Sequence, residues 1–213
     1  MIDRSILIVA EELLGRLEED EWVAVDCRFD LSAPDAGYEM YERGHLPGAV
    51  FVDLDRDLSN PVSSTTGRHP LPAVDRIVAR LEELGLGSRN KLVVYDSSHG
   101  ALAARAWWVL RWLGHDDVFL LDGGFDKWRA LGYPLESGAT SRPRVRFEPQ
   151  VRNELVLTTA ELAQDTDAIP SFRLLDARDR ARFRGDEEPI DTVAGHIPGA
   201  RSLPFARFVN ADG

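Results

Sequence analysis

Residues 91–108 read KLVVYDSSHGALAARAWW, a pattern typical of a strand, a turn and a helix. A short apolar run ends at Asp96, a turn of small polar residues follows, and a segment with helical spacing begins. Residues 74–87 carry a second helical pattern, and the apolar run at 118–124 leads into a third. Uniformly apolar strands that alternate with helices form parallel sheets covered on both faces. The sequence therefore predicts an α/β fold with a central parallel sheet flanked by helices.

The chain repeats itself after about 150 residues. VAVDCRFD followed by GHLPGA in the first half corresponds to RLLDARDR followed by GHIPGA in the second half. Asp26 and Asp176 are offset by 150 residues, and His45 and His196 by 151 residues. Because the offset hardly drifts, we interpret the two segments as a duplicated domain and not as two unrelated α/β openings.

The repeat fixes the expected domain boundaries. We predict a first domain over 1–133, a linker over 134–153 and the N-terminal part of a second domain over 154–213. The linker segment contains three prolines and four arginines and has no helical or alternating apolar period. The second copy ends before the counterpart of Asp96, so it lacks its central strand. Since half a domain cannot bury its apolar strands, we expect the chain to be a fragment, or another chain to complete the fold.

Taken together, VDCR…GHLPGA, the VVYD turn, ARAWW, LLDGGFDKW and LLDARDRARFRG…VAGHIPGA resemble the tandem-domain rhodanese family. The resemblance implies two three-layer rhodanese-like domains and a thiosulfate or 3-mercaptopyruvate sulfurtransferase without a cofactor. It also implies that a cysteine at a strand-to-helix turn takes a sulfane sulfur as a persulfide and passes it to cyanide or a thiol. Backbone amides at such a turn form an anion-binding nest that lowers the pKa of the thiol.

The resemblance places Asp96 where a catalytic domain carries that cysteine. Aspartate cannot carry a persulfide, but its carboxylate can accept the hydrogen bonds of the turn amides. An aspartyl nucleophile normally needs a second carboxylate or a metal ligand nearby, and a Ser98–His99 dyad lacks the Gly-x-Ser-x-Gly elbow. We therefore expect no catalytic residue in this chain, which alone should be inactive, with the nucleophilic cysteine beyond Gly213.

Arg182, in the sequence ARFRG, is the expected substrate-binding residue. The resemblance implies an arginine here that binds the anionic group of the sulfur donor, and a guanidinium suits sulfonate or carboxylate because it donates two parallel hydrogen bonds. The alternative is a solvated charge on a helix surface, which Arg178, Arg180 and Arg184 would share.

The two repeated histidines and the single cysteine are expected to be structural. His45 and His196 do not occur in closely spaced ligand pairs, so we predict no metal site and expect each imidazole to hydrogen-bond backbone within its turn. Asp26 and Asp176 are expected to pair with a basic group or to hold the same loop. Cys27 is interpreted as a small residue packed near a strand end, the alternative being a redox or sulfur-carrying thiol.

Charge and composition limit the partners. The 213 residues carry a net charge of −11, which argues against binding nucleic acid or an anionic membrane. The apolar runs are too short for a membrane helix, and the single cysteine excludes an internal disulfide, so we expect a cytoplasmic protein. The expected partners are a small anionic sulfur donor, a thiophilic acceptor and the missing part of the second domain. The alternative function is a non-catalytic rhodanese-like module that binds an anion or a protein.

Overall fold

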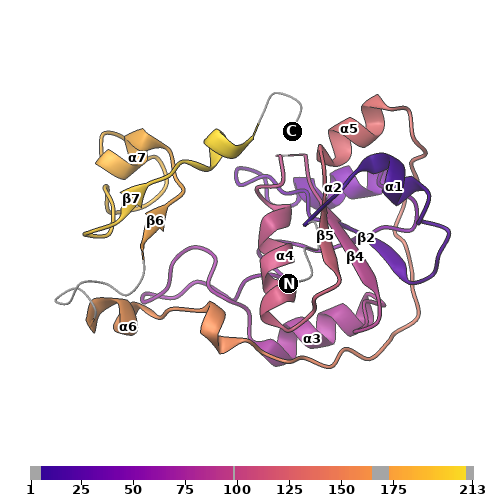
Figure 1. The fold of residues 1–213 in the computed structure, drawn as a ribbon, viewed down its shortest axis with the longest axis horizontal. Coiled ribbons are helices and arrows are strands. Elements are labelled where there is room, and N and C mark those ends of the chain that lie inside the picture. Colours follow the sequence, from indigo (N-terminus) through magenta and orange to yellow (C-terminus); the bar gives the residue numbers. More distant parts are fainter. Residues whose placement is uncertain (1–5, 98, 165–172, 210–213) are drawn as a thin grey trace. The chain divides into compact units, whose positions relative to one another are not determined.

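The computed structural model describes residues 6–97, 99–164 and 173–209 (Figure 1). The chain divides into two compact units, residues 1–153 and residues 154–212. Ser98, which the sequence places in the turn after the central strand, lies outside the described residues, as do residues 165–172. Within the described part of the chain, no helix is long and apolar enough to span a membrane.

The first unit contains the predicted parallel sheet. Its strands are β1 (Leu7–Ile8), β2 (Trp22–Asp26), β3 (Val50–Phe51), β4 (Lys91–Tyr95) and β5 (Val118–Leu121), in the order β1-β5-β4-β2-β3. All four pairings between neighbouring strands are parallel. The prediction of a central parallel sheet is thus confirmed, and its two longest strands are the central strand β4 and its neighbour β2.

Helices cover both faces of this sheet (Figure 1). The helices are α1 (Ala10–Leu14), α2 (Ala36–Arg43), α3 (Val74–Glu83), α4 (Ala103–Trp112) and α5 (Gly124–Ala130). Successive residues of a strand point to opposite faces. Trp22 and Ala24 accordingly join the core formed with α1 and α5, whereas Val25 lines a small apolar cavity with residues of α3 and α4. The sheet is therefore the middle of three layers.

The segment 134–153, predicted as a linker, runs along the first unit. Glu136 forms an isolated antiparallel bridge with His45, and Phe147 is buried. The backbone amides of Gln150 and Arg152 donate to the carbonyls of Leu113 and Trp112 at the end of α4. The absence of a periodic apolar pattern therefore identified irregular backbone, and this backbone is attached by hydrogen bonds to the unit that precedes it.

The second unit contains a short parallel pair of strands, β6 (Leu175–Asp176) and β7 (Arg201–Ser202). Its helices are α6 (Thr159–Gln164) and α7 (Arg180–Arg184), with the 3-10 turn η3 (Phe205–Phe208), and the 3-10 turn η1 (Asn153–Leu155) spans the boundary in sequence between the units. Large apolar side chains in this unit stay exposed, among them Leu175, Val193 and Phe208. The sheet of this unit thus leaves apolar surface uncovered.

The strand registers show that the repeat in the sequence is a repeat in structure. Asp26 of β2 is paired with Phe51 of β3, and Asp176 of β6 is paired with Ser202 of β7. These two pairs are related by the offsets of 150 and 151 residues that relate the two sequence motifs. The β6–β7 pair is therefore the second copy of β2–β3.

Candidate functional site

The turn between β4 and α4 in the first unit is closed by the side chain of Asp96. One carboxylate oxygen accepts the backbone N–H of Gly100 at 2.9 Å, and the other accepts those of Leu102 at 2.7 Å and Ala103 at 2.8 Å. Asp96 is 1% exposed. The carboxylate thus takes up three amides that would otherwise be available to a bound anion, which is the arrangement predicted from the sequence.

The backbone carbonyl of Asp96 packs against the first residues of α5. Gly124 has a φ of 56°, and a Cβ there would lie 2.3 Å from the Asp96 carbonyl oxygen, so only glycine fits this position. That carbonyl accepts the amide of Phe125 at 2.9 Å. The Gly123–Gly124 pair therefore lets the start of α5 pack against the Asp96 turn.

Cys27 lies at the end of β2 as a buried thiol. It is 3% exposed, and its Sγ lies 3.7 Å from the carbonyl oxygen of Val25. Burial raises its pKa well above the ordinary value, and the nearby negative charges of Asp26, Asp96 and Asp57 raise it further. Because the thiolate is the nucleophilic form, this cysteine is poorly suited to carry sulfur.

The same polar arrangement occurs in both units, next to the Gly-His turn. Arg28 and Arg178 each form a bidentate pair with the aspartate two residues earlier, Asp26 or Asp176, in which Nε donates to Oδ1 and Nη2 to Oδ2. Each arginine also donates to a glycine carbonyl at 2.6 Å, Gly44 in the first unit and Gly195 in the second. The predicted pairing of both aspartates with a basic group is thus confirmed.

The two copies of this arrangement differ in burial. Arg28 and Asp26 are 4% and 0% exposed, and the Arg28 guanidinium lies 3.9 Å from the ring centre of Phe125. Arg178 and Asp176 are 30% and 13% exposed. The hydrogen bonds from Arg178 hold the pKa of Asp176 below its ordinary value. Only the second copy therefore presents its arginine toward solvent.

The histidines correct one detail of the sequence prediction. His45 Nδ1 donates to the carbonyl of Tyr41 at 2.9 Å, and His196 Nδ1 donates to that of Phe183 at 2.7 Å. Each imidazole also stacks on the ring of the same residue. Their backbone partners thus lie in the preceding helix and not within the Gly-His turn, because the turn folds back onto that helix. Among the described residues, no cluster of three or more metal-ligating side chains occurs.

The stacking pairs align α7 with α2 and show that the second copy has a longer connection. His45 follows Tyr41 by four residues, but His196 follows Phe183 by thirteen. The added residues follow Gly185, which ends α7 with a φ of 78°. They contain Glu188 and Asp191, which sequence reasoning did not single out.

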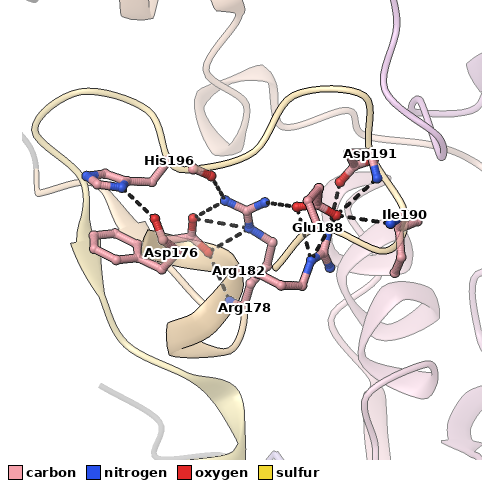
Figure 2. Close-up of polar contacts among 9 residues, drawn as sticks. Asp176, Arg178, Arg182, Glu188, Ile190, Asp191 and His196 are labelled. Carbon is pink, nitrogen blue, oxygen red and sulfur yellow. Dashed lines mark hydrogen bonds and ion pairs between the residues drawn. The ribbon is translucent and has the colours of Figure 1, made fainter. Parts of the chain in front are cut away.

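Figure 2 shows that Arg182 faces these two acidic residues. Its Nε and Nη2 donate to Glu188 Oε1 at 3.1 and 2.7 Å, and Nη2 also donates to Asp191 Oδ2 at 2.8 Å. The side chains of Arg182 and Glu188 are 16% and 5% exposed. Arg182 is therefore a partly buried, ion-paired residue, which differs from the solvated surface charge considered as the alternative.

Glu188 organises this cluster. Hydrogen bonds from Arg182, and then from the backbone amide of Asp191, lower the pKa of Glu188 to about 2. Glu188 Oε2 also lies 3.4 Å from Arg178 Nη1, so the carboxylate bridges both arginines. Arg184, by contrast, is exposed and pairs with Asp186. The structure thus brings Arg178 and Arg182 together and leaves Arg184 outside the cluster.

The chain is similar to known proteins both in sequence and in structure. Residues 9–131 match the rhodanese-like domain family. The chain is 46% identical to a probable 3-mercaptopyruvate sulfurtransferase of Pseudomonas aeruginosa, over 97% of this chain and 73% of that protein. It is 41% identical to a putative thiosulfate sulfurtransferase of Mycobacterium tuberculosis, over 98% of this chain and 74% of that protein. The crystal structure of a 3-mercaptopyruvate sulfotransferase from Escherichia coli superposes with a TM-score of 0.85 and 30% identity, over 97% of this chain and 78% of that one.

Proposed function

Because the chain belongs to the family of rhodanese-like domains, whose similar members are sulfurtransferases, we propose that it moves a sulfane sulfur from thiosulfate or 3-mercaptopyruvate to cyanide or a thiol. The observation that carries this proposal is the 46% identity to a probable 3-mercaptopyruvate sulfurtransferase over 97% of the chain. Within the second unit we assign the donor's anionic group to Arg182, since a guanidinium binds sulfonate or carboxylate through paired hydrogen bonds.

The proposed reaction passes through a cysteine persulfide. With thiosulfate, a cysteine thiolate attacks the outer sulfur and forms a new S–S bond, while the S–S bond of thiosulfate breaks and sulfite leaves with its electron pair. Cyanide then attacks the outer sulfur of the persulfide, forming thiocyanate and returning the thiolate. No net oxidation occurs, so the reaction needs neither a cofactor nor a metal.

We assign the nucleophile to residues that follow Gly213. Cys27 is the single cysteine of the 213 residues, and it is buried with a raised pKa. In the first unit, Asp96 takes up the amides that would stabilise a thiolate or persulfide. The chain spans 73% of the Pseudomonas relative, which leaves a quarter of that protein unmatched. These observations support a catalytic turn in the continuation of the second unit.

Within this proposal, Arg182 binds the anionic group of the donor and Glu188 is its positioning residue. The side chain of Glu188 is 5% exposed and contacts Nε and Nη2 of Arg182, so it restricts the orientation of the guanidinium. A fixed orientation lowers the entropy that the arginine loses when a donor binds.

The test compares residues 1–213 with the longer gene product. We expect residues 1–213 to form no thiocyanate from thiosulfate and cyanide, and the longer product to do so. Turnover by residues 1–213 alone would show that the assignment of the nucleophile is wrong. A stop codon directly after Gly213, in a stable protein, would instead favour a non-catalytic module that binds an anion or a protein.

Two variants of the longer product test the role of Arg182. Arg182→Ala should raise KM for the donor, because it removes the guanidinium. Arg184→Ala is the matched control: Arg184 lies on the same helix and its loss also removes one positive charge, but its ion pair among the described residues is with the exposed Asp186. Equal effects of the two substitutions would argue against a specific donor contact at Arg182.

A further inference from the structure

An irregular segment, residues 52–73, connects β3 with α3 at the carboxyl edge of the sheet in the first unit. Arg105, in the first turn of α4, holds the two ends of this segment together. Its Nη2 lies 3.1 Å from the carbonyl oxygens of both Leu58 and His69, and that of Pro70 lies at 3.4 Å. Open α/β sheets bind their ligands at the carboxyl edge. A guanidinium group is therefore fixed at an edge where ligands commonly bind.

Arg105 has no negatively charged partner in the described part of the chain. All its hydrogen bonds there are to backbone carbonyls, and its Nε is buried without a partner. The nearby carboxylates have other partners. Asp55 lies 3.0 Å from His69 Nε2, and Asp57 lies 3.1 Å from Arg80 Nε. Burial lowers the pKa of Arg105 below its ordinary value. Because a positive charge that is partly removed from water gains from a negative partner, this position favours an anion from solution.

A second guanidinium group approaches the same segment from α3. Arg76 Nη2 donates to the carbonyl of Ser59, the residue that follows Leu58. Within residues 6–97, 99–164 and 173–209, no carboxylate forms an ion pair with Arg76 either. Two guanidinium groups from different helices thus converge on adjacent carbonyls. Their charges are uncompensated by these residues, although the chain has a net charge of −11.

The side chain of Ser59 adds a hydrogen-bonding group that the described residues leave unused. Ser59 is 2% exposed, and its Oγ is buried without a partner among them. A hydroxyl can both donate and accept, and leaving a buried one unpaired is unfavourable. Since nearly all buried polar groups have a partner, this hydroxyl is a second sign of a ligand, independent of the arginine charges.

We propose that Arg76, Arg105 and Ser59 form a binding site for a small oxyanion with two negative charges, such as sulfate. Both arginines contact the protein through Nη2, so Nη1 of each is available to donate to the anion. Guanidinium groups bind oxyanions through paired hydrogen bonds, and two of them match a dianion in charge. The site lies in the first unit and shares no residue with the proposed donor site, so it goes beyond the proposed function.

Sulfate titration of residues 1–213 tests this site, with chloride at equal ionic strength as the control for screening. The NMR signals of the arginine Nε–H groups report binding at each guanidinium. Sulfate should shift the signals of Arg76 and Arg105 along one saturating curve, and chloride should shift neither.

Two variants test whether the arginines bind the anion directly. Arg76→Ala should weaken sulfate binding, followed at the Arg105 signal, roughly tenfold, the loss expected for one charge-assisted hydrogen bond. Arg129→Ala is the matched control: it also removes one positive charge from the first unit, but the exposed Arg129 pairs with Asp126. The control should change the affinity less than about twofold.

The outcomes separate this site from the proposed donor site. Equal shifts with sulfate and chloride, or equal affinities of Arg76→Ala and Arg129→Ala, would refute the inference. So would loss of the Arg105 shift in Arg182→Ala, because the anion would then bind in the second unit. Ser59→Ala keeps both arginines and should weaken binding roughly threefold, as expected for one neutral hydrogen bond, and an unchanged affinity would refute the role of Ser59. The amide spectrum shows whether each variant is folded, and turnover by the longer product tests the proposed function separately.

Discussion

Replacing Asp96 with alanine should destabilise the first unit strongly, although the residue has no proposed catalytic role. The substitution removes a buried carboxylate that accepts three backbone amides, those of Gly100, Leu102 and Ala103. These amides lie where the chain enters α4, and the side chain is 1% exposed. In the variant, water can partly replace the bonds of the half-buried Gly100 and Leu102, but it cannot replace that of Ala103, which is 0% exposed.

The size of the effect follows from these contacts. A hydrogen bond to a charged group contributes roughly 1.5–3 kcal/mol, and three of them set an upper range. Removing the carboxylate also ends the cost of keeping a charge away from water, which offsets part of the loss. We therefore expect Asp96→Ala to lower the free energy of unfolding by about 2–4 kcal/mol. Asp96→Asn should cost less, because one oxygen still accepts the amides of Leu102 and Ala103.

Urea unfolding followed by tryptophan fluorescence measures this loss. All five tryptophans, at positions 22, 107, 108, 112 and 128, lie in the first unit, so the signal reports on that unit. Asp126→Ala is the control, because it breaks only an exposed pair with Arg129 and should cost under about 1 kcal/mol. If Asp96→Ala costs no more than this control, the carboxylate does not hold the turn and the reasoning fails.

Three further predictions follow from the buried and ion-paired groups. Arg28→Ala should lower the free energy of unfolding by about 3–5 kcal/mol in the same urea assay, because it leaves Asp26 as an unpaired buried charge; a loss under about 1 kcal/mol would contradict this. Cys27 should react with a thiol reagent far more slowly in the native than in the unfolded protein, and equal rates would refute its burial. The carboxyl carbon of Glu188 should titrate near pH 2 by NMR and return toward the ordinary 4.5 in Arg182→Ala. Because the folded pKa is the lower one, the pair stabilises the fold above pH 4.5, and this contribution is lost as the pH falls toward 2.

The fold was predictable because its signals are local. Apolar runs bounded by turns become the strands β2, β4 and β5, and helical spacing becomes α3 and α4. The duplication was equally readable, since two motifs at a nearly constant offset must form the same strand pair. The course of the segment 134–153 could not be predicted in the same way. Its backbone follows the first unit through hydrogen bonds to carbonyls that are distant in sequence. No local sequence pattern indicates such bonds.

The candidate site was predictable only in part. Arg182 was found through the family resemblance, and its role in donor binding remains a proposal. Glu188 and Asp191 carry no motif of their own. The one available signal was the longer stretch between ARFRG and the second Gly-His turn, which places acidic residues beside a helix that carries arginines.

From the sequence we could predict the family, the parallel sheet, the duplication and the replacement of the expected cysteine by Asp96. These features depend on residue type and spacing along the chain. The three-dimensional structure was needed to show that the Asp96 carboxylate closes its own turn, that Cys27 is buried, and that Glu188 and Asp191 face Arg182. Hydrogen bonds, burial and ion pairs depend on distances in space, and the path of a turn brings together groups whose spacing in sequence does not indicate that they are close.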